Sequence, residues 1–218
     1  MTPIWHPSPN FGPRRGGARP SLVVLHYTGM ASAAAAVARL CDPGPEVSAH
    51  YLIAETGQVF ALVAEEMRAW HAGAGSWAGL SDVNSHSIGI ELANSGSEPF
   101  PHPQMLALER LLPGVMARWS IPPHHVIGHS DMAPTRKRDP GPRFDWQRLA
   151  LQGLSVWPTP QAADTDDFWR NLVSFGYPDA PRRDLLAAFR QRFRPAASGP
   201  LAAEDAGLAA GLAEIDRR

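Results

Sequence analysis

Residues 126–142, with the sequence VIGHSDMAPTRKRDPGP, join a short apolar run to a polar segment that contains three prolines. The apolar run stops at Gly128, which is typical of a buried strand that runs out into a loop. Proline fixes its backbone φ angle, so we expect a stiff loop. His129 and Asp139 lie in this loop, and both residue types bind zinc, which takes three protein ligands in a catalytic site. The alternative is a surface loop with a capping Asp and a solvated Arg-Lys-Arg run, and the segment alone favours neither.

The composition limits the classes of protein to consider. A chain of 218 residues is long enough for one medium domain and a small additional module. Because 20 Lys and Arg stand against 21 Asp and Glu, no global charge favours nucleic acid, and we expect no such partner. The single cysteine, Cys41, excludes an intramolecular disulfide and a cysteine-based zinc site. Any metal must therefore be held by histidine and carboxylate side chains.

Two further expectations concern location and assembly. No apolar stretch is long enough to span a bilayer, and the first ten residues lack a basic segment followed by an apolar one. We therefore expect a cytoplasmic monomer with no membrane partner.

The hydrophobic patterns predict an α/β fold, with a mixed central sheet flanked by helices. Residues 22–27 are apolar on both faces, as in a central strand, and His26 lies at the C-terminal end of that strand, where open α/β sheets place ligands. Residues 1–20 are rich in Pro, Gly and Arg, and we expect an irregular arm there. Further strands are predicted at 48–53, 58–63 and 87–93, and helices at 31–40, over the apolar stripe 105–119 and from 144 to 151.

The strand at 87–93 carries a candidate functional carboxylate. Alternation places Ser87, Gly89, Glu91 and Ala93 on one face of this strand. A carboxylate on a strand with small neighbours is unfavourable unless it has a partner or faces a cleft. We therefore expect Glu91 to face a functional cleft or a buried partner.

A change in composition near residues 157–163 predicts a domain boundary. We expect a main domain at 1–157 and a small helical module at 158–218, with helices at 166–175, 183–193 and 201–215. A module of about sixty residues is marginally stable alone, so we expect it to dock on the main domain.

Taken together, several motifs resemble a known family. They are His26 at a strand end, SIGIE at 87–91, and GHSD at 128–131 followed by KRDPG at 137–141, with supporting matches at VSAHYLI (47–53) and WHAG (70–73). In this order they resemble the zinc-dependent N-acetylmuramoyl-L-alanine amidases, AmpD/AmiD-like relatives of the peptidoglycan recognition proteins. The resemblance covers about residues 4–157. The tail is similar to a helical peptidoglycan-binding module.

The resemblance implies a zinc site and two catalytic side chains. His26, His129 and Asp139 would hold Zn²⁺ and leave one position open. Glu91 would be the general base, and Lys137 would stabilise the oxyanion beside the metal. The implied partners are peptidoglycan fragments or muropeptides, and the implied bond joins the lactyl group of N-acetylmuramic acid to L-Ala of the stem peptide.

Other polar residues have two interpretations each. Trp70 and His71 would line the glycan groove, or pack a loop. Asn84 would bind substrate, or form a turn. His50 is expected to be a hydrogen-bonded core histidine, because a fourth ligand would close the zinc site. Asp131 is either a partner of a ligand histidine or a cap, and the cap is favoured.

Two rival functions remain to be weighed. Peptidoglycan recognition domains share the implied architecture, and many bind without catalysis. The three implied ligands together with Glu91 and Lys137 favour an enzyme. A different zinc hydrolase acting on the stem peptide would need the same residues, so product analysis is required to separate it. The sequence also leaves open whether the substrate is polymeric wall or 1,6-anhydro-muropeptides.

Overall fold

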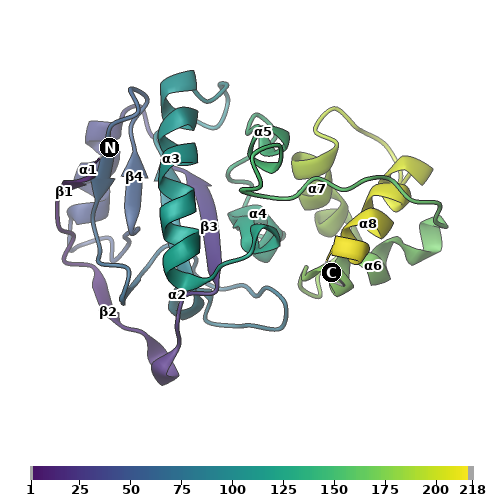
Figure 1. Cartoon of the computed structure of the whole chain (residues 1–218), viewed down its shortest axis with the longest axis horizontal. Helices are drawn as coiled ribbons and strands as arrows, with labels where there is room; N and C mark the ends of the chain where they lie inside the picture. The colour runs from purple at the N-terminus through teal and green to yellow at the C-terminus, as the bar shows by residue number, and fades with distance from the viewer. Residues whose placement is uncertain (1, 216–218) are drawn as a thin grey trace.

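A six-stranded mixed sheet forms the centre of the protein, whose computed structural model describes residues 2–215 (Figure 1). The strand order is β1-β5-β4-β7-β3-β8, and every neighbouring pair is parallel except β4 and β5. The strands are β1 (Ile4–Trp5), β3 (Leu22–Tyr27), β4 (Tyr51–Ile53), β5 (Val59–Ala61), β7 (Ser87–Leu92) and β8 (Val126–Gly128). A second, two-stranded sheet pairs β2 (Phe11–Pro13) with β6 (Met67–Ala69).

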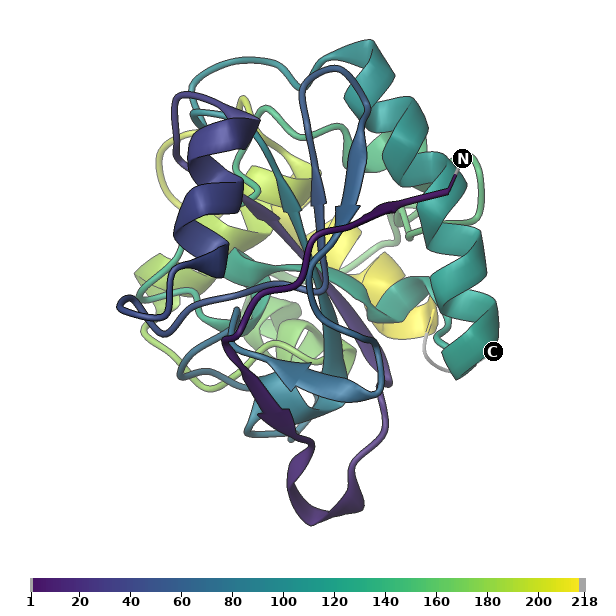
Figure 2. The ribbon, with the colours of Figure 1, turned by 90° about the vertical axis from the view of Figure 1, so that its left-hand side faces the viewer.

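Helices cover both faces of the central sheet, which confirms the predicted fold class (Figure 2). Helix α3 packs on one face, and α1 packs against β4 on the other. The helices are α1 (Ala33–Cys41), α2 (Val83–His86), α3 (His102–Trp119), α4 (His129–Met132), α5 (Trp146–Ala150), α6 (Phe168–Phe175), α7 (Arg182–Phe193) and α8 (Ala203–Ile215).

The alternation of side chains on β3 and β7 separates the core from the site. On β3, Val23 and Leu25 pack with Leu108 and Leu112 of α3 in one hydrophobic cluster. Leu22 and Val24 point to the opposite face, and His26 follows them with the same parity. The apolar residues facing α3 therefore determine which side chains are left for the other face.

The C-terminal helices pack on the face that also carries His26. Leu22, Val24 and Ile127 share a hydrophobic cluster with Phe168 of α6 and Phe189 of α7. This cluster confirms the expected docking of the C-terminal helices, which lie to the right of β3 in Figure 1. The boundary between residues 157 and 158 remains a prediction.

The N-terminal arm is more regular than we predicted. Residues 1–20 were expected to be irregular, but β1 pairs in parallel with β5, and β2 pairs with β6. Both strands are short and lie at sheet edges, where a proline such as Pro13 is tolerated because no further strand needs its amide. The expectation of an irregular arm was therefore wrong at residues 4–5 and 11–13.

The segment after β8 also differs from the predicted loop. It begins with one helical turn, α4, in which the Asp131 carboxylate accepts the Gly128 amide at 2.8 Å. An acidic residue at the third position of a helix stabilises the first turn in this way. His129 therefore sits on a capped helical turn, which holds it more firmly than a loop would.

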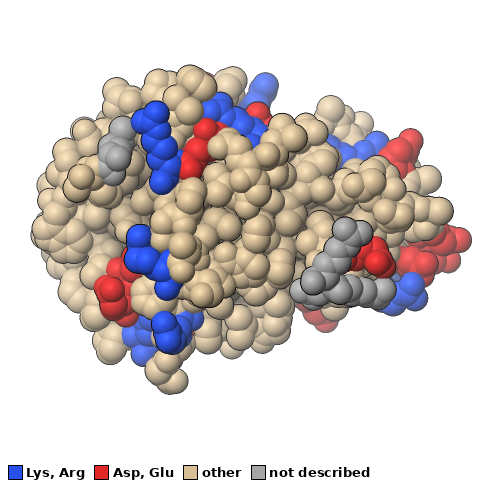
Figure 3. Space-filling view, in the orientation of Figure 1, with Lys and Arg blue, Asp and Glu red and all other residues tan. Residues whose placement is uncertain are grey.

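The surface shows no dominant charge on the face drawn in Figure 3, where acidic and basic side chains are interspersed in a largely uncharged surface. Within residues 2–215, no helix combines the length and apolar character that crossing a bilayer requires.

The shared cluster leads to a stability prediction. Phe189→Ala should lower the free energy of unfolding by about 3–5 kcal/mol, because Phe189 is fully buried and its removal leaves a cavity. Urea unfolding followed by tryptophan fluorescence measures the change, and the whole chain should unfold in one transition. Val173→Ala on α6 is the control, since this side chain is 56% exposed and should change stability by less than about 0.5 kcal/mol. Separate unfolding of α6–α8 at lower urea would contradict a shared core.

Candidate metal centre and active site

Three neighbouring parallel strands bring the candidate residues to one edge of the sheet. His26 on β3 pairs in register with Glu91 on β7, and Leu25 pairs with Gly128 at the end of β8. His129 follows Gly128 directly. The carboxyl ends of parallel strands form the ligand-binding edge of open α/β sheets, so this is where a site is expected.

The three predicted ligands form one buried cluster. The Nδ1 atoms of His26 and His129 lie 2.9 Å apart, and each lies 2.9 Å from Oδ2 of Asp139. This cluster was also the one group of three or more potential metal ligands found within residues 2–215. Zinc binds nitrogen and oxygen at about 2.0–2.2 Å, and one point can lie at that distance from all three atoms. The donor set therefore fits a zinc ion.

The hydrogen bonds behind the cluster assign the tautomer of each ligand histidine. His129 Nε2 donates to the carbonyl oxygen of Ala72 at 2.8 Å. The Ser87 hydroxyl donates to the Val83 carbonyl, so it accepts from Nε2 of His71 at 3.1 Å. His71 Nδ1 must then accept a hydrogen bond from His26 Nε2 at 3.0 Å. Both ligand histidines thus keep Nδ1 unprotonated, which is the form that binds a metal.

The charge states of the cluster also suit a cation. Burial, followed by repulsion from His129, lowers the pKa of His26 to about 4. Burial alone would raise the pKa of Asp139, but the two imidazoles that face its Oδ2 atom outweigh burial and hold this pKa well below its ordinary value. A neutral His26 imidazole and an ionised Asp139 carboxylate are the states that metal binding requires.

Glu91 differs from Asp139 in having a buried oxygen atom without a hydrogen bond within the described residues. Its Oε2 atom is buried and accepts no hydrogen bond from residues 2–215. Burial, with repulsion from Asp139 as the next cause, raises the pKa of Glu91 to about 8. A carboxyl group with a raised pKa that lines a cleft is a candidate for proton transfer.

The cluster lies in a cleft of about 620 Å³. Glu91 and Lys137 line the same cleft, as do Trp70 and His71. The structure thus brings both predicted catalytic side chains beside the metal ligands, and their roles remain predictions. The remaining lining residues are Tyr27, Thr28, Met30, Ala36, Arg39, Leu40, Val47, Ser48, Arg136 and Arg138.

His71 supports a ligand more directly than its predicted place in a substrate groove suggested. Besides its hydrogen bond to His26, its ring lies over Gly89 of β7, where a Cβ atom would come within 2.4 Å of His71 Cγ. Gly89 therefore provides the space that allows the imidazole to reach His26.

Asn84 also has a structural partner. Its Oδ1 atom accepts the backbone amides of His71 at 3.0 Å and Ala72 at 2.8 Å. This contact holds the segment that carries His71, and substrate binding by Asn84 remains a prediction. Trp70 lines the cleft as predicted, and its contact with substrate also remains a prediction.

Two other polar residues follow the predicted structural roles. His50 is fully buried, accepts the Gly89 amide at 2.9 Å through Nδ1 and lies 3.1 Å from the Met67 carbonyl through Nε2. The prediction of a hydrogen-bonded core histidine is confirmed. Asp131 caps α4, as favoured from the sequence.

Arg136 makes a contact that the sequence analysis did not predict; a solvated Arg-Lys-Arg run was one of the two alternatives for this segment. The Arg136 guanidinium donates to the carbonyl oxygens of Ala72 and Ala74. The Ala72 carbonyl also accepts from His129, so Arg136 joins the ligand loop to the segment around His71. No local pattern predicts this contact, because the residues are 64 positions apart.

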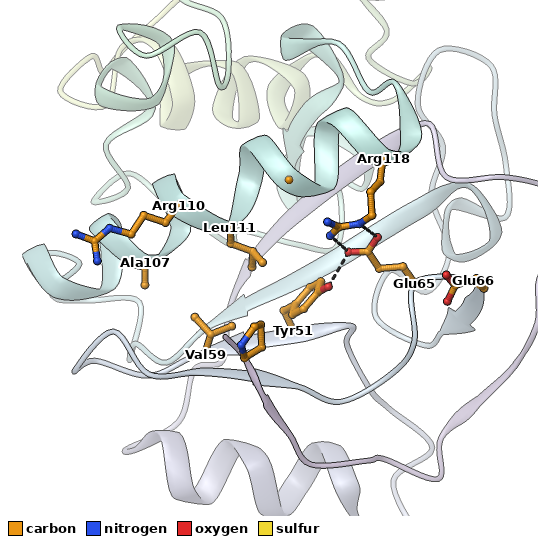
Figure 4. Close-up of a pocket in the computed structure, with 10 residues that line it drawn as sticks. Tyr51, Val59, Glu65, Glu66, Ala107, Arg110, Leu111 and Arg118 are labelled. Atoms are coloured by element: carbon orange, nitrogen blue, oxygen red, sulfur yellow. Dashed lines mark hydrogen bonds and ion pairs between the residues drawn. The ribbon is translucent and has the colours of Figure 1, made fainter. Parts of the chain in front are cut away.

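A second hollow, of about 500 Å³, lies between α3 and strands β4 and β5 (Figure 4). Its central acid, Glu65, accepts from the Tyr51 hydroxyl at 2.6 Å and from Arg118, and both side chains point to it in Figure 4. Trp119 donates to the same carboxylate. The hydrogen bonds of the Glu65 carboxylate are therefore made by neighbouring side chains, and we interpret the Glu65–Arg118 ion pair in this hollow as structural.

The fold and the site define a class of protein: an α/β protein with a His-His-Asp set able to hold a metal ion and a carboxyl group beside it. Comparisons with known proteins then identify the family. The N-acetylmuramoyl-L-alanine amidase family matches residues 16–142. The chain is 36% identical to the N-acetylmuramoyl-L-alanine amidase AmiD of Escherichia coli, over 90% of this chain and 83% of that protein.

Other relatives agree. The chain is 33% identical to the 1,6-anhydro-N-acetylmuramyl-L-alanine amidase AmpD of Citrobacter freundii, over 66% of this chain and 86% of that protein. The solved complex of E. coli AmiD with the substrate anhydro-N-acetylmuramic acid-L-Ala-D-gamma-Glu-L-Lys superposes with a TM-score of 0.82 at 33% identity, covering 94% of this chain and 98% of that one. The chain belongs to the N-acetylmuramoyl-L-alanine amidase family, as the motifs predicted.

The raised pKa of Glu91 predicts a pH-dependent effect of Glu91→Gln on the metal-free protein. The pKa of Glu91 rises from 4.5 to about 8 on folding, so the wild-type protein loses stability as pH rises through this window. Glutamine has no charge to bury, so the melting temperature of Glu91→Gln, relative to wild type, should increase from pH 4.5 to pH 8.

Calorimetry in the presence of a chelator measures this difference. Glu66→Gln is the matched control, because Glu66 is exposed and its replacement should give a difference that hardly changes with pH. A difference for Glu91→Gln that is the same at pH 4.5 and pH 8 would show that Glu91 is not held neutral by burial.

Proposed function

We propose that this amidase is a zinc enzyme that hydrolyses the amide bond between the lactyl group of N-acetylmuramic acid and L-Ala of the stem peptide. The observation that carries the proposal is the cluster of three donor atoms, 2.9 Å from one another, beside the Glu91 carboxyl group, whose buried Oε2 atom has no hydrogen-bond partner within residues 2–215. We propose His26, His129 and Asp139 as the ligands. When bound, zinc polarises a substrate carbonyl and makes hydroxide available near neutral pH.

The side chains of the cleft supply proton transfer and charge stabilisation. Glu91 takes the proton of the attacking water and passes it to the leaving nitrogen, so that the C–N bond breaks to a lactyl carboxylate and a free L-Ala amine. A bound cation favours the ionised form of Glu91, which counteracts the pKa rise caused by burial. Lys137 lines the cleft and offsets the negative charge that develops on the carbonyl oxygen.

The preferred substrates are proposed to be muropeptides, with an anhydro-muramyl end among those accepted. Two relatives support this: E. coli AmiD was solved with an anhydro-N-acetylmuramic acid peptide, and AmpDh3 of Pseudomonas aeruginosa with anhydromuramic pentapeptide. Incubation with defined muropeptides and mass spectrometry of the products tests the bond and the substrate together. A cut within the stem peptide would indicate a peptidase instead.

The metal assignment predicts a stoichiometry. The purified protein should bind about one zinc per chain, because the described residues offer one such donor set. His26→Ala should lose the metal and turnover, and chelation should abolish amidase activity. His50→Gln is the control, since His50 has hydrogen-bond partners outside the cluster and should retain zinc. Full activity in a metal-free preparation would refute the zinc proposal.

The two catalytic side chains should be dispensable for the metal. Glu91→Gln keeps the shape of the side chain, so kcat should fall by roughly 10²–10⁴ with zinc retained. Lys137→Ala should lower kcat by about 10²–10³, with KM nearly unchanged if the lysine acts only in the transition state. Steady-state kinetics on a muropeptide and zinc analysis measure both. A rise in KM at constant kcat would show that Lys137 binds substrate instead, and loss of zinc would show that the residue supports a ligand.

A further inference from the structure

The C-terminal helices contact the helical turn that carries His129. Arg192 of α7 donates through Nη1 to Oδ2 of Asp131 at 2.7 Å, and both side chains are almost completely buried. Through Nη2 it also donates to the Val126 carbonyl and to the Ser155 hydroxyl, each at 3.1 Å. A residue of α7 is therefore hydrogen-bonded both to β8, the strand that precedes His129, and to α4, the helical turn that begins with His129.

A second residue of the C-terminal helices holds the other oxygen of the same carboxylate. The hydroxyl of Tyr177, between α6 and α7, donates to Oδ1 of Asp131 at 2.8 Å. Oδ2 accepts from Arg192 and from the Gly128 amide. Three donors thus hold the carboxylate that caps α4, and two of them come from the C-terminal segment: Tyr177, between α6 and α7, and Arg192 of α7.

The buried charge makes this arrangement sensitive to the loss of a partner. The Arg192 guanidinium lies 4.1 Å from the ring centroid of Trp146. Within the described residues, Asp131 is the one carboxylate with which Arg192 forms an ion pair. Removal of one partner of a buried ion pair leaves an uncompensated charge, which is strongly unfavourable. Asp131 would then have to move toward water, and the turn that it caps would move with it.

We propose that Tyr177 and Arg192 are positioning residues for the metal centre: they hold Asp131, and through it the first turn of α4, so that His129 Nδ1 stays within reach of His26 and Asp139. The C-terminal helices thereby contribute to metal affinity although no residue of theirs is a ligand. This inference rests on the proposed zinc site, and it assigns the helices a role beyond docking.

A neighbouring ion pair provides the comparison that separates positioning from general stability. Arg190, on the same helix, is also buried and pairs with Asp205 of α8 through Nε at 3.1 Å and Nη2 at 2.5 Å. Its other hydrogen bonds within the described residues go to the carbonyls of Gly199 and Pro200, so this pair makes its contacts within the C-terminal segment. Arg190→Met and Arg192→Met remove the same charge from one helix, and only the second change reaches α4.

The test is zinc affinity of the full-length protein, measured by competition with a chromophoric chelator. Tyr177→Phe and Arg192→Met should each weaken zinc binding on the order of 10-fold or more, as is usual for residues that orient metal ligands. Arg190→Met should bind zinc as the wild type does. Arg192→Lys should recover part of the lost affinity, because a single donor can still reach Asp131.

The outcomes are distinguishable. Circular dichroism identifies variants that remain folded, and if Arg192→Met does not fold, Tyr177→Phe decides, since it removes one oxygen atom. Wild-type affinity in the folded variants overturns the inference, as does an equal loss in Arg190→Met. Failure of the wild-type protein itself to bind zinc overturns the metal proposal instead.

Discussion

The register of three parallel strands is the constraint on which the site depends. Pairing of β3 with β7 sets His26 opposite Glu91, and pairing with β8 brings Gly128, and hence His129, to the same edge. Side chains alternate between faces, so a slip of one residue on β3 would turn His26 into the core under α3. The apolar residues that pack on α3 oppose that slip, because it would remove Val23 and Leu25 from their contacts with α3. Hydrophobic packing on one face thus determines the chemistry on the other.

Hydrogen bonds hold the two ligand histidines in place: in each ring, the Nε2 atom, which does not face the metal position, donates to a neighbouring group. His129 is tied to a backbone carbonyl, and His26 is tied through His71 to Ser87. Glu91 is the exception, since its buried oxygen has no partner within residues 2–215. The contrast separates groups that must stay in place from the one group that must exchange a proton.

Much of this arrangement could be predicted from local sequence. The strands at 22–27 and 87–92 are strongly apolar, so His26 and Glu91 could each be singled out within them, and His129 directly after the strand at 126–128; the family resemblance then placed the three in one site. Contacts between distant segments could not be predicted in that way. Arg192 and Asp131 are 61 positions apart, and His71 and His26 are 45 apart, so no window of sequence shows either pair. The short strands β1 and β2 were not predicted, because strands at a sheet edge tolerate the Pro and Gly residues that usually indicate an irregular chain.

The glycine at 89 has a consequence for the variation that this site can accept. In most strands, a change from glycine to alanine is mild or favourable, because it restricts the unfolded chain. Here the added methyl group would occupy the volume of the His71 imidazole and push it away from His26. A saturation library at this codon, selected only for metal retention, should therefore return glycine alone. Redesign of the cleft for a new substrate has to treat residues 71 and 89 as one unit, even though neither is a ligand.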